Sequence, residues 1–429
     1  MKKNKLFSVL LVVMVCLSQL AFSQGVTTSA MKGKVVSTTG EEIFTANVLV
    51  THLPTGTQYG TITGEDGRFN IRNMRVGGPY EIKVSFIGYS DEVLKDIYLQ
   101  LNKTAEFNIT LKESVVTMQE VVVVFDKDDV ISSGRTGAMT NVNEEQILSM
   151  PSIKRSQRDL TRMTPESDGN SFGGRNNLYN NFSLDGSIFN NSFGLDYATP
   201  GGQADAQPVS LDAIEQIQVS LAPFDVREGG FTGAGINAVT KSGTNEFKGT
   251  AYLYYRNQEM IGEKVSGIKY PNLDYSFKQY GISMGGPIIK NKLFFFANFE
   301  AERIDQQAHG FIADDGSNSN LPNTASVAYD DILAVQSHLR DRWGYEPGEF
   351  QGYNHETFNN KFLLKLDWNI TKGHNFTIRY NMLDAWKDIL PHPEAIGGRG
   401  PTSYRLPFEN SSYRISNKIH SFVGELNSI

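Results

Sequence analysis

Hydrophobic and polar residues alternate along most of this chain with the two-residue period of β-strands. Between residues 30 and 112 the alternating runs are short and are separated by turn sequences such as TTGEE, GEDG and RVGGP. The runs are MKGKVVS, TANVLVTHL, TQYGTIT, RFNIRNM, YEIKVSFIGY and AEFNITL. Short strands at this spacing predict a small β-sandwich over residues 30–112 and a fold class that is mainly β.

From residue 244 to residue 429 the alternating runs become longer. In NKFLLKLDWNIT, apolar side chains from Phe362 to Ile370 alternate with charged and amide side chains. Strands that are apolar on one face and charged on the other suit a membrane barrel. Tight turns near 288–293 and 371–373 alternate with long polar links, which agrees with this interpretation. The pattern predicts about six barrel strands, and a soluble β-sandwich with surface loops is the alternative.

The stretch between these regions, residues 130–243, mixes helical and strand signals. NEEQILSM predicts a short helix, DAIEQIQVS a short helix that leads into a strand, and AGINAVTK another strand. GNSFGGRNNLYNNFSLDGSIFNNSFG is rich in Gly and Asn, which favour turns. We therefore expect an α+β unit here.

The first 23 residues have the organisation of a secretory signal peptide. A basic start with Lys2, Lys3 and Lys5 precedes an apolar core and small residues before a cleavage site after Ser23. Cys16 is the only cysteine, so the mature chain cannot be held by disulfides; a lipoprotein anchor at Cys16 is the weaker alternative because Val15 precedes it. The protein is expected to be exported.

Composition and motifs argue against several functions. The net charge of −7 and the lack of a basic block after the first residues argue against nucleic-acid binding. GGFTGAGINAVTKS lacks the spacing of a phosphate-binding loop, and no zinc-protease motif occurs. ADDGSNSN (313–320) offers oxygen ligands in poor spacing for calcium. We expect no catalytic residue, metal or cofactor, and so no enzyme.

Two resemblances organise these observations. GKVV, TGEDGRFNI and GPYEIKVSFIGY resemble the carboxypeptidase-regulatory-like, or transthyretin-like, sandwich domain; it implies a structural module, with sugar binding as the alternative. QEVVVVF, NNFSLDG, DAIEQIQV and GAGINAVTKSGTNEFKG resemble TonB-dependent outer-membrane receptors of the SusC/RagA- or Oar-like branch. That family implies a plug domain at 130–243 and a barrel of about 22 strands, of which 244–429 would supply the first part.

The apolar run within residues 117–129 has a specific role in this family. An unpaired, β-prone strand at the plug entrance, the TonB box, is captured by the periplasmic C-terminal domain of TonB through β-augmentation. The residues matching this role are Glu120, Val121, Val122, Val123, Val124 and Phe125. The alternative is that 121–125 is the last strand of the sandwich or the first of the plug.

The Asn- and aromatic-rich part of the plug is the expected ligand contact, because amides donate and accept hydrogen bonds and rings offer stacking faces. The candidates are Arg175, Asn176, Asn177, Tyr179, Asn180, Asn181, Asp185, Asn190, Asn191 and Phe193. The alternative for many of them is an ordinary turn role. Glu215, Arg227 and Lys241 are predicted to form ion pairs that hold the plug to the barrel wall.

The resemblance implies an outer-membrane receptor that imports a polar solute, such as a glycan or peptide, with energy passed through TonB from its inner-membrane complex. The sandwich and plug would face the periplasm, the barrel would contact outer-membrane lipid, and a surface-exposed lipoprotein is a further partner. Because about six strands cannot close a barrel, the chain is expected to be the N-terminal part of a longer receptor. The alternatives are an adhesion or surface-organisation protein on this scaffold and a fragment unable to transport.

Overall fold

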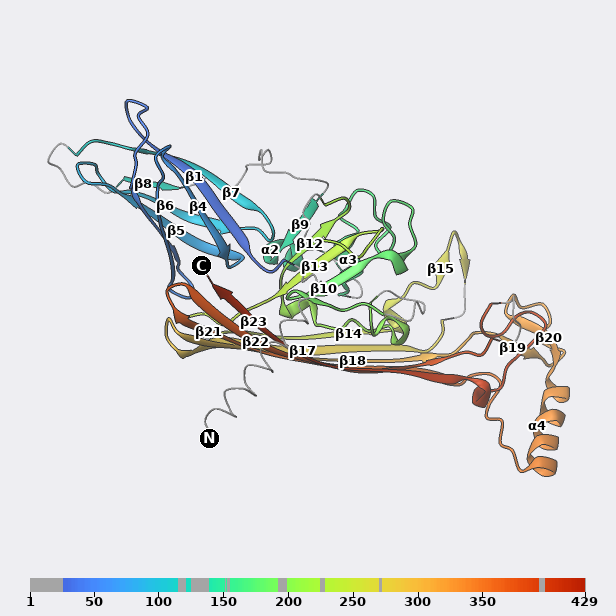
Figure 1. Cartoon of the computed structure of the whole chain (residues 1–429). Coiled ribbons are helices and arrows are strands. Elements are labelled where there is room, and N and C mark those ends of the chain that lie inside the picture. The colour runs from blue at the N-terminus through green and yellow to red at the C-terminus, as the bar shows by residue number, and fades with distance from the viewer. Residues whose placement is uncertain are drawn as a thin grey trace, which may run out of the picture.

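The computed structural model describes residues 26–114, 121–124, 139–150, 152, 155–191, 199–223, 228–269, 272–392 and 398–428. These residues form three units that follow one another along the chain (Figure 1). A sandwich lies at one end of a long sheet, and an α+β unit covers one face of that sheet. The predicted signal peptide, together with Glu120, Phe125, Phe193 and Arg227, lies outside the described residues.

The N-terminal unit is a β-sandwich. One sheet has the order β4-β1-β7 and the other begins β3-β2-β5-β6. Its apolar positions alternate with exposed ones, and the inward residues Val48, Val50, Ile82 and Val84 are fully buried between the sheets. The strands are β1 Ser29–Ser37, β2 Asn47–His52, β3 Thr57–Ile62, β4 Arg68–Met74, β5 Gly77–Ser85, β6 Glu92–Leu99 and β7 Thr104–Leu111.

The valine-rich segment forms a strand on the edge of this sandwich. β8 (Val121–Val124) runs parallel to β6, with Glu92 opposite Val121 and Lys95 opposite Val124. The expectation of an unpaired strand is therefore not what the structure shows. Its backbone instead extends the second sheet, which agrees with the alternative that this run is the last strand of the sandwich.

The middle unit is a five-stranded sheet with short helices. The strand order is β11-β10-β13-β12-β9, in which β10 and β13 are parallel. Buried residues of this unit form a core that extends to Phe296 and Leu363 of the long sheet. The elements are β9 Met139–Asn143, α2 Glu144–Ser149, α3 Gln157–Thr161, η1 Asn177–Tyr179, β10 Asn181–Leu184, β11 Ser187–Ile188, η2 Gly202–Ala204, η3 Leu211–Ala213, β12 Ile214–Ser220 and β13 Gly235–Thr240.

The C-terminal unit is a six-stranded antiparallel sheet in the order β14-β17-β18-β21-β22-β23. On β21 the side chains of Lys361, Leu363 and Lys365 are buried beneath the middle unit, while Leu364 and Trp368 are 37% and 42% exposed on the other face. The predicted division of each strand into two faces is thus present. The strands are β14 Lys248–Asn257, β17 Tyr275–Ile289, β18 Leu293–Gln307, β21 Asn354–Thr371, β22 His374–Ile389 and β23 Tyr413–Ser428.

The two ends of this sheet differ. At one end, tight turns join β17 to β18 and β21 to β22, and the sandwich lies beside them; at the other end, long connections carry further elements (Figure 1). Ile332 and Phe350 form a small apolar core in these connections with Phe408 beside them. The elements are η4 Gln258–Met260, β15 Lys264–Val265, β16 Ile268–Lys269, β19 Ile312–Asp314, β20 Thr324–Ala328, α4 Tyr329–Trp343 and η5 Glu409–Ser411.

Candidate functional site

A two-residue turn places the principal contact between the middle unit and the long sheet. Asp185 and Gly186 join β10 to β11 with φ of +44° and +75°, and an Asp-Gly pair with positive φ at both positions forms the preferred hairpin turn. The turn directs the Asp185 carboxylate into the interface. There Oδ2 accepts from Arg379 Nη1 at 2.7 Å and from Thr240 Oγ1 at 2.6 Å, and Oδ1 accepts from the Thr240 N–H at 2.7 Å.

This contact corrects the prediction that Asp185 touches ligand. Asp185 is 7% exposed and Arg379 is fully buried. Burial raises the pKa of Asp185, but the charges of Lys365 and Arg379 and the Thr240 hydrogen bonds outweigh it and lower the pKa to about 2. The carboxylate is therefore charged at neutral pH and holds the middle unit to β22.

A second polar network lies further along the same interface. Glu300 on β18 accepts hydrogen bonds from Ser210 Oγ at 2.8 Å and from Lys361 Nζ at 2.6 Å, and also from the Tyr252 hydroxyl. Asp212 accepts from Thr250 Oγ1 at 2.7 Å. Buried charges need partners of this kind, so the polar faces of the strands bind the middle unit.

Of the three residues predicted to hold the plug to the barrel wall, Lys241 and Glu215 have their nearest described contacts elsewhere, and Arg227 lies outside the described residues. Lys241 pairs with Glu144 at 2.8 Å, within its own unit. Glu215 lies beside Gly77 of the sandwich. The contacts of Arg379, Glu300 and Lys361 with the middle unit were not predicted from the sequence, although all three residues lie on the polar faces of predicted strands.

The remaining ligand candidates divide into two groups. Buried Asn180 donates to the Asn170 carbonyl at 2.7 Å and accepts from the Ala234 N–H at 3.0 Å; Asn190 accepts from the Phe182 N–H at 2.8 Å and donates to Asn181 at 2.7 Å. These amide side chains stabilise turns and neighbouring strands, which agrees with the alternative that they have ordinary turn roles. Arg175, Asn176 and Tyr179 are exposed, Asn177 is half-buried, and Asn191 already has an interaction.

A cavity of about 350 Å³ lies between the middle unit and the long-connection end of the sheet. We call it the loop-end cavity. Its lining includes Asn177 and Asn180 from the predicted ligand contacts. The charged residues around it are Arg155, Arg158, Arg162, Arg256, Lys361, Asp159, Asp205 and Glu302.

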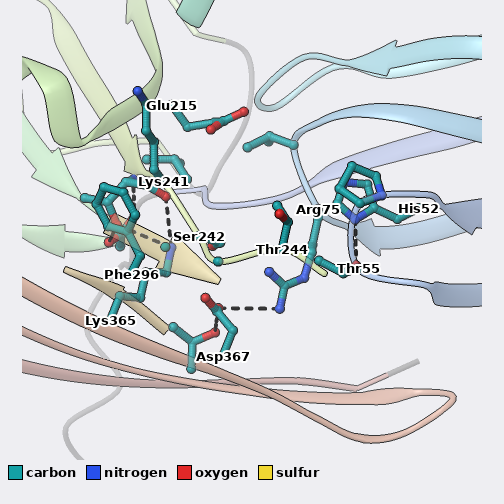
Figure 2. Close-up of a pocket in the computed structure, with 18 of the residues that line it drawn as sticks. His52, Thr55, Arg75, Glu215, Lys241, Ser242, Thr244, Phe296, Lys365 and Asp367 are labelled. Atoms are coloured by element: carbon teal, nitrogen blue, oxygen red, sulfur yellow. Dashed lines mark hydrogen bonds and ion pairs between the residues drawn. The ribbon is translucent and has the colours of Figure 1, made fainter. Parts of the chain in front are cut away.

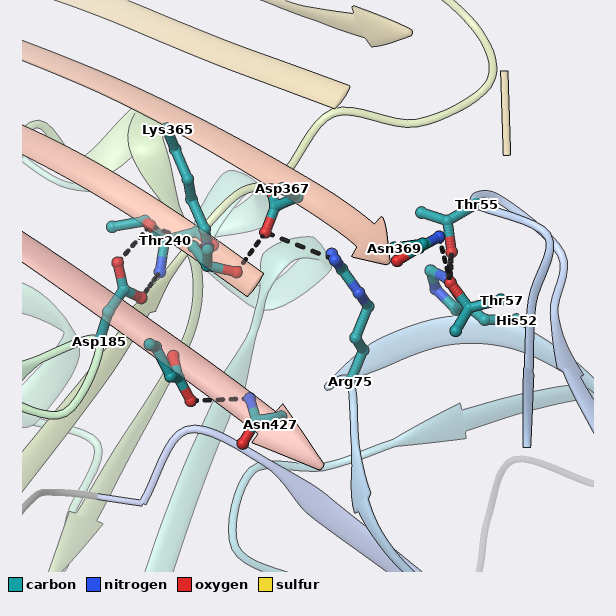
Figure 3. A network of polar contacts seen from close by, with 12 residues as sticks. His52, Thr55, Thr57, Arg75, Asp185, Thr240, Lys365, Asp367, Asn369 and Asn427 are labelled. Carbon is teal, nitrogen blue, oxygen red and sulfur yellow. Dashed lines mark hydrogen bonds and ion pairs between the residues drawn. The ribbon is translucent and has the colours of Figure 1, made fainter. Parts of the chain in front are cut away.

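A cavity of about 680 Å³ lies at the opposite end, between the sandwich, the middle unit and the tight-turn end of the sheet. We call it the turn-end cavity (Figure 2). Arg75 of the sandwich crosses it to Asp367 of β21, with Nη2 3.4 Å from Oδ1. Asp367 also accepts from Thr377 Oγ1 at 2.8 Å, and Asn369 Nδ2 donates to Thr57 Oγ1 at 2.9 Å (Figure 3).

Backbone groups add to this docking of the sandwich. The Gln216 amide accepts from the Leu101 N–H at 2.9 Å and donates to the Leu99 carbonyl at 3.1 Å. The Asn245 N–H donates to the Pro54 carbonyl at 2.7 Å. The sandwich is therefore fixed against both other units.

Glu215 and His52 are two further groups of the turn-end cavity with shifted pKa values. Burial and the nearby Glu144 carboxylate raise the pKa of Glu215 to about 7, against the lowering effect of Lys241 and other cations. Burial, with Arg75 nearby, lowers the pKa of His52 to about 3. Glu215 thus changes charge near neutral pH where the sandwich meets the middle unit.

In the described part of the chain, no group of three or more His, Cys, Asp or Glu side chains is placed to hold a metal ion. Among the same residues, the helices are all too short or too polar to cross a membrane.

Known proteins match several parts of the chain. The family model of the carboxypeptidase regulatory-like domain matches residues 30–112, and that of an outer membrane beta barrel domain matches residues 239–325. The TonB-dependent transporter Oar of Myxococcus xanthus is 25% identical over 342 residues, covering 75% of this chain and 30% of Oar. The TonB-dependent receptor SusC of Bacteroides thetaiotaomicron is 36% identical over 148 residues, covering 34% of this chain and 13% of SusC.

The chain thus spans less than a third of the length of these two relatives, both of which are transporters or receptors. Among solved structures, the outer membrane transporter YddB from Escherichia coli aligns with a TM-score of 0.44 at 14% identity. That alignment covers 68% of this chain and 37% of YddB.

Proposed function

We propose that this chain, which is similar to TonB-dependent transporters and matches an outer membrane beta barrel domain, imports a polar solute across the outer membrane with energy delivered by TonB. In this proposal the six-stranded sheet belongs to the barrel wall and the middle unit is the plug. The tight turns, the sandwich and the turn-end cavity face the periplasm. The long connections and the loop-end cavity face the cell exterior.

The observation that carries this proposal is the plug's attachment to the polar faces of the strands. The Asp185–Arg379 pair and the Glu300 network bind the middle unit to the inner face of the sheet, which it covers. On the opposite face, Leu253 and Phe422 are 71% and 76% exposed. An apolar outer face with a polar, covered inner face fits a wall between lipid and an occupied lumen.

We propose that TonB captures the segment 120–125. In the structure the backbone of Val121–Val124 pairs with β6 in a parallel arrangement. Capture by TonB would therefore replace β6 by a strand of TonB as the pairing partner. Such an exchange replaces backbone hydrogen bonds by equivalent ones, which keeps its net free-energy change small. The sandwich edge would then hold the strand until TonB engages it.

A matched pair of substitutions in the full-length protein tests this proposal. Val122→Pro removes the backbone N–H and blocks strand pairing, whereas Val122→Thr keeps a β-branched residue with its N–H. We expect Val122→Pro to abolish energised uptake while ligand binding is retained, and Val122→Thr to transport normally. Uptake by Val122→Pro at the wild-type rate would show that TonB does not act through this strand.

Energy dependence separates import from an adhesion role. Uptake that stops when the proton gradient is collapsed, or when TonB is deleted, supports import. Attachment of cells to a surface that needs this protein but neither TonB nor the gradient would favour the adhesion alternative.

A further inference from the structure

The loop-end cavity has a surplus of positive charge. Five cationic side chains and three carboxylates surround its volume of about 350 Å³. Three of the cations, Arg155, Arg158 and Arg162, come from the single stretch RSQRDLTR, which includes α3. Because this stretch packs on the inner face of the sheet, its arginines and Arg256 of β14 converge on one space.

The carboxylates of the cavity already have other partners. Asp159 Oδ2 accepts from Ser156 Oγ at 3.2 Å and from Ser152 Oγ at the start of α3. Asp205 pairs with Lys387 at 3.5 Å, and Glu302 accepts from Asn359 Nδ2 at 2.9 Å. Lys361 is likewise paired with Glu300, so the four arginines of the described lining face the carboxylates of Asp159 and Glu302 and remain in excess over them.

Arg158 and Arg162 are the accessible cations. Both are exposed, and neither forms an ion pair with any residue that the structure describes. Their stems pack over Gly169, where a β-carbon would lie 2.8 Å from Arg158 Cγ and 3.0 Å from Arg162 Cγ. Gly169 also has a φ of +104°, which favours glycine. The absence of a side chain at this position therefore lets both stems lie against the cavity wall.

Arg155 and Arg256 are held in place by aromatic residues. Arg155 Nη1 donates to the Tyr254 hydroxyl at 2.9 Å, and its guanidinium lies 4.9 Å from the Tyr254 ring centre. Arg256 Nη2 donates to the Tyr275 hydroxyl at 2.6 Å and lies 5.1 Å from that ring. The two tyrosine contacts therefore fix the position of both guanidinium groups at the cavity.

We propose that the loop-end cavity is a binding site for an anionic solute that carries two or more carboxylates. This inference rests on the proposed function and specifies its ligand class. Guanidinium groups bind carboxylates through paired, charge-assisted hydrogen bonds, and the fixed pair of arginines would position a ligand that the accessible pair attracts. Acidic oligosaccharides and acidic peptides share this chemistry.

The test is calorimetric titration of the full-length protein in detergent with four probes. Trigalacturonic acid and triglutamate are the acidic probes, and maltotriose and triglutamine are their neutral counterparts. We expect at least one acidic probe to bind about tenfold or more tightly than its counterpart. The acidic probe that binds identifies the source of the carboxylates.

The variant Arg158→Gln/Arg162→Gln locates the site, and Arg342→Gln on α4 is the matched control because it removes an exposed arginine outside the cavity. We expect the double variant to weaken binding of the acidic probe about tenfold or more, with the control unchanged. Circular dichroism and the amount of protein in the outer membrane verify folding of both variants.

Three results would overturn the proposal: no binding of either acidic probe, equal binding of acidic and neutral probes, or full affinity in the double variant.

Failure of the proposed function gives a different result. In that case the acidic probe would bind with the expected arginine dependence, but its uptake would not need TonB. Conversely, TonB-dependent uptake of a neutral solute with no acidic binding would leave the function intact and remove this ligand class.

Discussion

The loop-end and turn-end cavities are lined by similar polar side chains but use them differently. In the turn-end cavity the charges are paired, between units in the case of Arg75 with Asp367 and within the middle unit in the case of Lys241 with Glu144. In the loop-end cavity the carboxylates are engaged elsewhere, and Arg158 and Arg162 extend into accessible space. One cavity is a joint between units, and the other has the properties of a receptor site.

The difference shows that residue type does not identify a binding site in this protein. Asp185 and Asn180 have ligand-like chemistry, yet both make hydrogen bonds that hold the middle unit in place. The distinguishing feature is whether a polar group already has a partner inside the protein. A charge satisfied internally contributes to stability, whereas an accessible charge without a counter-charge is available to a ligand.

The largest expected effect comes from the buried pair beside the turn-end cavity. Asp185→Ala leaves Arg379 buried without its carboxylate, and removal of one partner of such a pair costs about 3–5 kcal/mol. We expect the unfolding free energy, measured by urea titration in lipid vesicles, to fall by this amount.

Lys387→Ala is the matched control for this substitution, because its pair with Asp205 is partly exposed. Loss of such a surface pair costs about 0–1 kcal/mol. If both variants lose the same small amount, the Asp185–Arg379 pair does not hold the middle unit to the sheet.

The docking of the sandwich is the next test. Arg75→Ala removes a charged partner of Asp367 and is expected to cost about 1.5–3 kcal/mol of docking free energy. Faster hydrogen exchange should follow at backbone amides that contact Gln216, such as Leu101, while β2 and β5, whose inward residues form the sandwich core, keep their protection. Unchanged exchange at Leu101 would show that the docking does not depend on this ion pair.

A pH dependence should distinguish the turn-end cavity further. Since the folded-state pKa of Glu215 is raised to about 7, its stabilising contribution is complete below its unfolded value of about 4.5 and is lost as pH rises through about 7. We expect a loss of about 1–2 kcal/mol between pH 5 and 8 that Glu215→Gln does not show.

His52 has the opposite sign, because its lowered pKa makes its contribution present above about 6.5 and lost as pH falls towards 3. The comparison of wild type with Glu215→Gln cancels this term, since both proteins retain His52. Parallel stability curves for the two proteins from pH 5 to 8 would contradict the assigned role of Glu215.

The smallest expected effect is on stability at the loop-end cavity. Arg158 and Arg162 have no ion pair to lose among the described residues, so Arg158→Gln/Arg162→Gln should change the unfolding free energy by less than about 0.5 kcal/mol. A loss above about 2 kcal/mol, in the range of the Arg75 effect, would mean that both cavities are structural joints.

Local patterns were sufficient for much of the fold. Period-two alternation located the strands of the six-stranded sheet and their two faces, because a strand's side chains alternate regardless of what covers them. The Asp-Gly turn and the short helix at NEEQILSM were equally local; Asn143 and Gln146 form the reciprocal cap that begins α2. The mainly β fold class and the outer-membrane setting follow from such patterns together with the family motifs.

Local sequence patterns did not predict which polar residues pair with one another. Asp185 and Arg379 are separated by 194 positions, and Arg75 and Asp367 by 292, so no local period relates them. The pairing of Val121–Val124 with β6 also depends on which sheet edge is nearby once the sandwich has folded. The predicted ligand segment therefore contributes Asn177 and Asn180 to the loop-end cavity, but the sequence did not show that Asn180 is structural or that Arg158 and Arg162 line the same space.

The sequence by itself determined where strands form, which face of each is apolar and which family motifs the chain carries, because these depend on neighbours a few residues apart. Only the tertiary structure decided that Asp185 is a structural anchor and that the arginines of RSQRDLTR converge with Arg256 on one cavity. The physical reason is that burial and counter-charges arise from packing between distant segments, and these two properties decide whether a polar group stabilises the protein or remains available to a ligand.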